Sequence, residues 1–546
     1  MERRSVLKGA AATIAGAAAG SSVFRPSTGY AAAPSSEPEW RYVADVVVVG
    51  SGASGFPASI VAREAKASVI IVEAEPHIGG HGICSSGNVP LGGGTKRQKK
   101  AGIDDSPDLI FSDLTDWSIV ESNGAPDYRY NDREIIRAFA DNNVATFDFL
   151  EKHGVVFIDE PPDASGGNAV GNSVPRENHA AVMDWPMVQT GAPADPSVQK
   201  TTASGNGLIR PLEASARALG VQILLSHRMV SLYRESSSGP VNGITVENQG
   251  QRFGIRARRG VVLATGGSSS NVNFRRMFDP RLTEEYCGVA GEPWSKQDAS
   301  GELAGLDIGA SLWGMFNETG EFGYGITKGN LGTRYNYTFL RWMPGSDVFS
   351  QARAAGLQVK DWQDIIQVNM IGKRFYDETG PQFSSNDYHS VWPYTPGSYL
   401  NAKNVNWNPH NWINAAMAGI GDGHNGGGPI WAIFDSDAVT REGWDPNPPN
   451  VDPEGFFFQA NTLAELASKI VMPYQRVPMP ANTLVETVDR YNSFVDAGTD
   501  ADFGKPTPRW KIARPPFYAA WSTPVVHDCR AGLRINASCQ VIDFSG

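Results

Sequence analysis

The sequence has few cysteines, no excess of basic charge and, after residue 35, no long apolar run. Its four cysteines in 546 residues form no Cys-x-x-Cys pair, so neither a zinc ribbon nor an attached haem is expected, and no metal site is predicted. Lys and Arg number 47 against 58 Asp and Glu, a net charge of -11, which gives no electrostatic reason to bind nucleic acid. Without a run of about 18 apolar residues, no stable membrane span is expected. The predicted state of the cysteines is free or buried, although Cys529 and Cys539 are close enough in sequence to bridge a turn.

The first 33 residues have the pattern of an export signal. Arg3 and Arg4 precede a weakly apolar Ala/Gly run that ends in small residues at Ala31 to Ala33. This pattern is typical of a twin-arginine signal peptide, with an ordinary signal or a basic tail as the alternative. The pattern predicts the twin-arginine translocase as a partner and an exported protein, in the periplasm or at the cell exterior. That route carries folded proteins, which suits an enzyme that acquires its cofactor before export.

A dinucleotide-binding turn follows the leader. The Val-rich run from Tyr42 to Val49 predicts a buried strand, residues 58–65 a helix, and residues 68–72 a second strand that ends at Glu73. A G-x-G-x-x-G turn lies between the first strand and the helix, and its glycines allow a tight turn, close approach of a pyrophosphate and packing of the helix on the sheet. Glu73 is placed to accept hydrogen bonds from a ribose diol. The cofactor residues predicted from this unit are Gly50, Gly52, Ala53, Ser54, Gly55 and Glu73.

NAD and FAD both use such a unit, and later motifs separate them. Gly79-Gly80 begins a Gly/Ser-rich loop, and a strand from Gly260 ends in Ala-Thr-Gly-Gly at residues 264–267. Together with the turn and Glu73, these motifs resemble the FAD-dependent flavoproteins of the fumarate reductase/succinate dehydrogenase family. That family includes flavocytochrome c fumarate reductases, urocanate reductases and 3-ketosteroid 1-dehydrogenases. The resemblance implies FAD as the cofactor and adds the following binding residues: Gly79, Gly80, His81, Ser86, Gly87, Val230 through its backbone, Thr265, Gly266 and Asp298.

The resemblance also implies the architecture. Gly372 to Glu378 resembles the Gly-Lys-Arg-Phe-x-Asn-Glu segment of the capping domain of the family. The expected fold class is α/β, a Rossmann-like three-layer FAD-binding domain with an inserted α+β capping domain. The expected boundaries are a signal peptide at 1–33, the first part of the FAD domain at 34–321, the cap at 322–524 and a return to the FAD domain at 525–546. Relatives continue past this return with Gly-Leu-Tyr-x-x-Gly-Glu, so the return is expected to be truncated.

Departures from the family pattern bear on the substrate. Gln382 stands where fumarate reductases carry a proton-delivering arginine, and their Gln-x-His-Pro-Thr segment is replaced by residues 331–337. A small dicarboxylate would lack most of its anion clamp, so fumarate is not the expected substrate. Aromatic residues concentrated in this region favour a bulky, flat substrate such as a steroid or an aromatic enone, with plain core packing as the alternative. These rings are Trp313, Phe316, Phe322, Tyr324, Tyr335, Tyr337, Trp342 and Trp392.

Three residues are the candidates for catalysis. His527 matches the active-site histidine of the family and is expected to bind a carbonyl oxygen or relay a proton. Arg530 is placed to polarise the same oxygen, and Tyr335 is a candidate acid or base. His81 carries a separate hypothesis: in membrane-type members a histidine at this spacing bonds covalently to the flavin. Simple hydrogen bonding of His81 to a non-covalent FAD is the favoured alternative.

The expected function is therefore that of an exported FAD-dependent oxidoreductase acting on a CH-CH bond beside a carbonyl. Its partners would be a small-molecule substrate and an external electron donor or acceptor, such as a cytochrome, a quinone or oxygen. The alternative is a truncated or catalytically inactive flavin-binding protein, suggested by Gln382 and the expected truncation.

Overall fold

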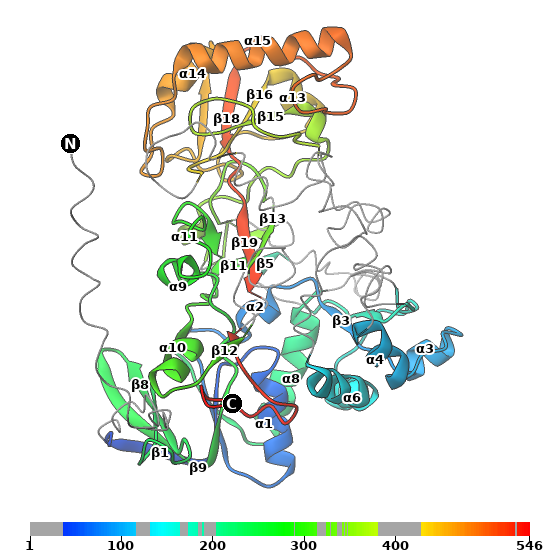
Figure 1. Ribbon diagram of the computed structural model, residues 1–546, viewed down its shortest axis with the longest axis vertical. Helices are drawn as coiled ribbons and strands as arrows, with labels where there is room; N and C mark the ends of the chain where they lie inside the picture. The colour runs from blue at the N-terminus through cyan, green and yellow to red at the C-terminus, as the bar shows by residue number, and fades with distance from the viewer. Residues whose placement is uncertain are drawn as a thin grey trace, which may run out of the picture.

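The structure is a computed structural model in which sheets lie at both ends of the molecule and β19 runs between them (Figure 1). It describes residues 37–115, 132–163, 173–183, 188–189, 204–288, 290–313, 324–327, 329–335, 341–342, 344–346, 348–379, 416, 427–529 and 532–546. The predicted signal segment, together with Gln382 and Arg530, lies outside these ranges. Among the described helices, none combines the length and apolar character that crossing a bilayer requires.

A six-stranded sheet forms one end of the molecule, in the order β6-β2-β1-β9-β8-β7. Its first four strands are parallel, while β8 pairs antiparallel with both β9 and β7. The apolar runs of β1 and β2 are buried, as parallel strands covered on both faces require. The strands are β1 (Trp40–Val49), β2 (Val69–Val72), β6 (Gln222–Leu224), β7 (Arg228–Tyr233), β8 (Gly243–Asn248) and β9 (Gln251–Leu263).

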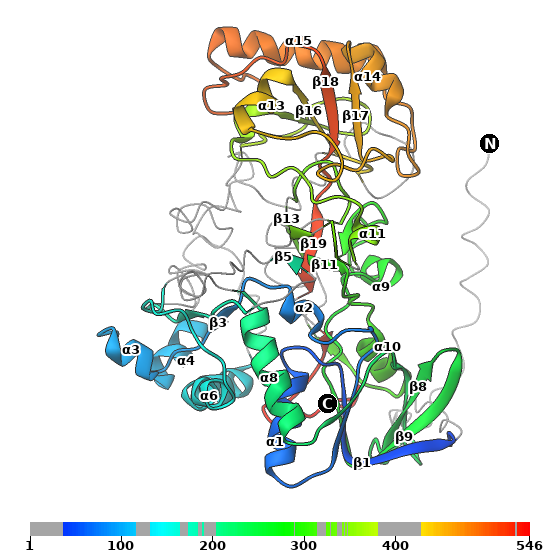
Figure 2. The same cartoon turned by 180° about the vertical axis from the view of Figure 1, so that it is seen from behind.

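Helices pack on this sheet, and further elements lie beside it. Helix α1 (Gly55–Glu64) packs on β1 and β2 and against α8 (Asn206–Ala218), and the two helices lie side by side in Figure 2. Phe56 and Ile60 of α1 and Ile209 of α8 share one buried cluster. The remaining elements of this side are α2 (Gly80–Ile83), β3 (Asn88–Pro90), α3 (Lys96–Lys100), α4 (Pro107–Thr115), α6 (Arg133–Lys152), β4 (Glu177–His179) and β5 (Val188–Gln189).

A small central sheet joins the two ends. Strand β19 (Val525–Cys529) pairs in parallel with β10 (Cys287–Gly288) and antiparallel with β13 (Tyr324–Thr327). Along the chain it follows β18 (Phe517–Trp521), which belongs to the sheet at the other end of the molecule. Consecutive strands therefore connect the two ends. Around it lie α9 (Val272–Arg276), β11 (Ala290–Pro293), α10 (Ser300–Asp307), β12 (Leu312–Trp313), β14 (Arg341–Trp342), α11 (Phe349–Ala352) and β20 (Gly532–Leu533).

The other end is an α+β unit, which we call the cap. Its sheet runs β15-β16-β18-β17, and α15 (Ala481–Ala497) lies across it in Figure 1. Its core includes Trp431, Tyr491 and Trp521, each less than 3% exposed. The other elements are η1 (Trp362–Asp364), β15 (Ile366–Val368), β16 (Trp431–Asp435), α13 (Ser436–Glu442), β17 (Phe457–Ala460) and α14 (Leu463–Lys469).

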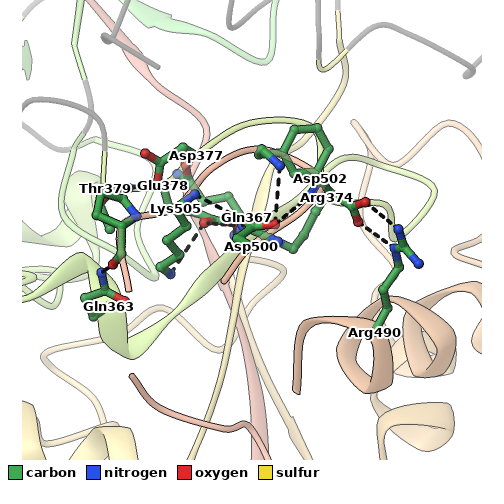
Figure 3. Close-up of polar contacts among 12 residues, drawn as sticks. Gln363, Gln367, Arg374, Asp377, Glu378, Thr379, Arg490, Asp500, Asp502 and Lys505 are labelled. Carbon is green, nitrogen blue, oxygen red and sulfur yellow. Dashed lines mark hydrogen bonds and ion pairs between the residues drawn. The ribbon is translucent and has the colours of Figure 1, made fainter. Parts of the chain in front are cut away.

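Buried charges fix the Gly372–Glu378 segment inside the cap (Figure 3). Arg374 pairs with Glu378 at 2.8 Å and with Asp500 at 3.0 Å, and Lys505 lies 3.4 Å from Glu378. The four side chains are at most 4% exposed. Burial raises the pKa of Glu378, but Arg374 and Lys505 outweigh it and hold that pKa at about 2. The motif is thus an internal brace of the cap.

The expectation for the cysteines is confirmed. All four lie in the described chain as thiols outside disulfides: Cys84 and Cys287 are buried, Cys529 is half-buried and Cys539 is exposed. Burial raises the pKa of Cys84, which keeps this thiol protonated and inert.

Candidate functional site

The three glycines of the turn after β1 are required for different reasons. Gly50 has φ +103°, and a Cβ there would lie 2.2 Å from the Ala264 carbonyl oxygen. A Cβ on Gly55 would lie 2.0 Å from the Gly50 carbonyl oxygen. A Cβ on Gly52 would meet only the Gly79 carbonyl oxygen, at 3.8 Å. The fold itself therefore requires Gly50 and Gly55 but leaves the surface over Gly52 open, as a cradle for a closely bound phosphate requires.

Ser51, a residue between the glycines, links three segments of the site. Its hydroxyl donates to Glu73 Oε2 at 2.6 Å, its backbone N–H donates to the same oxygen at 3.0 Å, and the Gly79 N–H donates to its Oγ at 3.1 Å. Glu73 Oε1 accepts from the Glu75 N–H at 3.0 Å. The turn, the end of β2 and the start of the Gly/Ser-rich loop are thereby fixed to one another. Ala53 and Ser54 are exposed, and no side chain caps the N-terminus of α1.

Helix α2 positions His81. Gly79 and Gly80 both have positive φ, and the Gln297 amide nitrogen lies 3.2 Å from His81 Nδ1. The Ser269 hydroxyl donates to Gln297 Oε1 at 3.2 Å, which fixes the amide with its nitrogen toward the histidine. Cys529 Sγ, at the end of β19, lies 4.0 Å from the same Oε1. His81 and the end of β19, which are far apart in sequence, thus meet at Gln297.

The loop after α2 brings Ser86 and Gly87 to the start of β3. Ser86 Oγ donates to Asn88 Oδ1 at 3.1 Å. Gly87 has φ +81°, and a Cβ there would lie 2.5 Å from the backbone of Ser204. Gly87 is therefore required by the packing of this loop against the chain before α8.

Val230 occupies a β-bulge. The register of β7 with β8 passes from Met229 to Ser231 and leaves Val230 as the extra residue. The extra residue of a bulge lacks a ladder partner, so its backbone groups are available to another acceptor or donor. This geometry fits the predicted contact of the Val230 backbone with an adenine ring.

Asp298 lies just before the start of α10. Its carboxylate binds Arg228 of β7 and accepts from the Ser300 N–H at 3.0 Å. Gly301 packs on Thr265, because a Cβ there would lie 2.2 Å from Thr265 Oγ1, and Gly266 has φ +79°. The predicted residues Thr265, Gly266 and Asp298 therefore lie around the end of β9.

A groove of about 410 Å³ opens at the end of β19. The Arg534 guanidinium stacks on the Trp313 ring at 4.9 Å there. Glu302 is buried close to Gly532, one of the residues that line this groove. Burial raises the pKa of Glu302 to about 7. The groove is lined by Asp132, Ile135, Trp313, Cys529, Gly532, Leu533, Arg534 and Ile535.

Of the three catalytic candidates, the structure describes only the side chain of Tyr335. His527 lies at the centre of β19, between β10 and β13, but its side chain is outside what the structure describes, as is Arg530 altogether. Tyr335 is half-buried and packs against the cluster that contains Ile83 and Val525. Burial raises the pKa of Tyr335 above its usual 10.0, with Arg334 opposing the shift. A neutral phenol at this position suits a proton donor better than a base.

Sequence reasoning missed several residues of this site. Ser51 was an unassigned position inside the glycine motif, and only the structure shows its contact with Glu73. Gln297 had no motif to mark it, although it directly precedes the predicted Asp298. In the part of the chain that the structure describes, no three His, Cys, Asp or Glu residues gather to hold a metal.

A Rossmann-like sheet with a phosphate cradle, a fixed ribose-side acid and an α+β cap defines a dinucleotide-dependent flavoprotein. Comparisons with known proteins identify the family: the signature of the FAD binding domain family matches residues 45–313 and 342–546. The chain belongs to this family, among the flavoproteins of the fumarate reductase/succinate dehydrogenase group. The predictions of the family, the fold class, FAD and an FAD-dependent oxidoreductase acting on CH-CH bonds are confirmed.

Individual relatives cover most of the chain. A 3-oxosteroid 1-dehydrogenase of Mycobacterium tuberculosis is 27% identical over 92% of this chain and 90% of its own length. A fumarate reductase (cytochrome) of Shewanella frigidimarina is 24% identical over 91% of this chain and 69% of its own. The solved structure of a 3-ketosteroid delta1-dehydrogenase from Sterolibacterium denitrificans has a TM-score of 0.57 at 20% identity, covering 92% of this chain and 91% of that one. This last likeness concerns the fold.

Proposed function

We propose that the protein is an exported FAD-dependent oxidoreductase that acts on a CH-CH bond beside a carbonyl in a bulky, steroid-like or aromatic substrate. The observation that carries the substrate class is the similarity to a 3-oxosteroid 1-dehydrogenase along nearly the full length of both chains. The departures at Gln382 and residues 331–337 argue against fumarate.

The residues of the chain divide the work as follows. Gly52 and the uncapped N-terminus of α1 hold the pyrophosphate, Glu73 the ribose, and the bulge at Val230 the adenine. Bound FAD supplies hydride acceptance or donation at its N5. Tyr335, kept neutral by burial, donates a proton or a hydrogen bond, and His527 and Arg530 bind the carbonyl oxygen.

Export and the electron partner are part of the same proposal. The paired arginines at Arg3 and Arg4 support translocation by the twin-arginine route. The external electron donor or acceptor is a cytochrome, a quinone or oxygen, and the direction of the reaction follows from which of them is present.

Two measurements on the purified protein test the function. Flavin absorption bands near roughly 370 and 450 nm establish bound FAD. Dye-linked turnover of an α,β-unsaturated or saturated 3-ketosteroid, with fumarate as the comparison, then tests the substrate class. Stable FAD binding without turnover of any of these compounds would refute the proposal in favour of a catalytically inactive flavin-binding protein.

A further inference from the structure

Arg334 is partly buried, and its guanidinium has a donor without a hydrogen-bond partner in the described chain. Its Nη2 donates to the Glu284 carbonyl oxygen at 3.0 Å, whereas its Nε is buried without a hydrogen-bond partner in the described chain. The Tyr335 and Tyr474 rings lie near the guanidinium, at 5.4 and 5.0 Å from it. A buried donor of a charged group that stays unpaired is costly, so such a group calls for an explanation.

Arg275 shows what a purely structural arginine looks like in the same region. Its three nitrogens donate to four backbone carbonyls, those of Ser269, Leu282, Thr283 and Tyr286, at 2.6 to 2.9 Å. That side chain is fully buried and holds together the chain around α9. Arg334 makes one such bond among the described residues, so bracing the backbone does not account for its Nε.

Arg334 lies between the FAD-binding body and the cap. On one side are Cys287 of β10, which pairs with Val525 of β19, and Glu292 of β11, both close enough to interact electrostatically with it. Strand β11 in turn packs on α2 and β19. On the other side is Tyr474, which packs on Trp521 of the cap. Ligand sites occur preferentially at such junctions between bodies.

Thr333 adds a second unused polar group beside Arg334. It is 0% exposed, and its hydroxyl has no partner among the described residues. The segment 331–335 is itself firmly held, since Leu331 pairs with Leu357 and the Gly332 N–H donates to the Trp521 carbonyl oxygen at 3.0 Å. A well-fixed segment thus carries two adjacent side chains with unused donors.

We propose that Arg334 is a further substrate-binding residue, whose guanidinium donates to the activating carbonyl oxygen of the substrate in addition to the contacts proposed for His527 and Arg530. This inference rests on the proposed function. It places a cation in the segment that replaces the histidine-containing clamp of the fumarate reductases. Carboxylates offset part of the positive charge here, because Glu285 lies 3.5 Å from Arg476 and Glu292 interacts electrostatically with Arg334, so a neutral ketone oxygen is accommodated as well as a carboxylate.

The experiment compares two ligands that differ only in this oxygen, with a carboxylate as a third probe. An α,β-unsaturated 3-ketosteroid, its 3-deoxo analogue and cinnamate are titrated into the FAD-loaded protein, and binding is followed by the change in flavin absorption. The variants are R334Q, R334K, which keeps the positive charge, and R490Q as the control. Arg490 of α15 pairs with Asp502 on the surface of the cap, where its side chain is 61% exposed. Flavin content and thermal unfolding report on folding for each variant.

We expect R334Q to weaken binding of the ketosteroid about 10- to 100-fold, the loss typical of a hydrogen bond to a charged group, with the deoxo analogue unchanged. R334K should recover part of the loss, R490Q should bind normally, and in turnover KM should rise more than kcat falls. Equal losses for the ketosteroid and its deoxo analogue would overturn the inference, as would no oxygen-dependent binding to the wild-type protein. Arg334-dependent binding without turnover would retain the inference and defeat the proposed function, whereas turnover unaffected by R334Q would do the reverse. Tighter Arg334-dependent binding of cinnamate than of the ketosteroid would overturn the assignment of Arg334 to a carbonyl oxygen.

Discussion

Replacing Glu378 by Gln should destabilise the cap strongly, because it removes one carboxylate from between two buried cations. Arg374 at 2.8 Å and Lys505 at 3.4 Å would retain their positive charges, with Asp500 beside Arg374 and Asp377 near Lys505 as remaining carboxylates. Removing one partner of a buried pair typically costs about 3–5 kcal/mol. The pKa gives an independent figure: a fall from 4.5 to about 2 corresponds to roughly 3 kcal/mol, at about 1.36 kcal/mol per pKa unit.

The pH dependence has a definite sign. The folded-state pKa of Glu378 is depressed, so its contribution is fully present above pH 4.5 and is lost as the pH falls toward about 2. Urea unfolding, followed by the fluorescence of the buried Trp431 and Trp521, measures the free energy of unfolding of the cap. The difference between wild type and E378Q should be largest near pH 7 and shrink below pH 4.5.

A surface pair in the same unit provides the matched control. Arg490 and Asp502 are 2.5 Å apart, but their side chains are 61% and 28% exposed, so D502N should cost about 0.2–1 kcal/mol. If E378Q lost no more stability than D502N, or if its loss were independent of pH, the buried pairs would not be holding the cap together.

Three further predictions concern the cofactor and the chemistry. G52A should keep the apoprotein folded but lose FAD binding, whereas G50A should lower the yield of folded protein, because its Cβ would lie 2.2 Å from a carbonyl oxygen; thermal unfolding and FAD titration separate the two, and normal FAD binding by G52A would count against the cradle. FAD should be non-covalent, since the Gln297 amide holds His81 as a hydrogen-bonding group; acid precipitation should leave the yellow colour in the supernatant, and a yellow pellet would instead establish a covalent bond to the flavin. Y335F should lower kcat about 100-fold at unchanged flavin content, and unaltered kcat in steady-state assays would exclude Tyr335 as the proton donor.

Local sequence signals predicted the FAD-binding half of the fold well. The first strand was expected at 42–49 and is β1 (Trp40–Val49), and the helix at 58–65 is α1 (Gly55–Glu64). These elements are readable because buried parallel strands are continuous apolar runs and the glycine turn between them has a strict spacing. The strand expected from Gly260 is longer, β9 (Gln251–Leu263), because its first half, which pairs with β1 and β8, mixes buried residues with exposed charged ones and lacks the continuous apolar run of its second half.

Contacts between distant segments had no such signal. His81 and Cys529 meet at Gln297, and the Arg374 brace reaches Asp500 and Lys505, more than 120 residues further along the chain. Neither contact leaves a periodicity or a spacing in the sequence, because the fold alone brings these residues together. The Gly-Lys-Arg-Phe resemblance located the brace but not its partners.

The residues that best identify the ligand site are those whose features the packing of the protein does not explain. Gly52 lacks a Cβ although nothing in the described chain would meet one closer than 3.8 Å, and Val230 is left without a ladder partner inside an otherwise regular pair of strands. Arg334 keeps a donor unpaired where Arg275 satisfies its own. Each feature costs stability or conformational entropy that packing does not return. Taken together, they support the proposed contacts of Gly52 with the phosphate, of Val230 with the adenine and of Arg334 with the substrate oxygen.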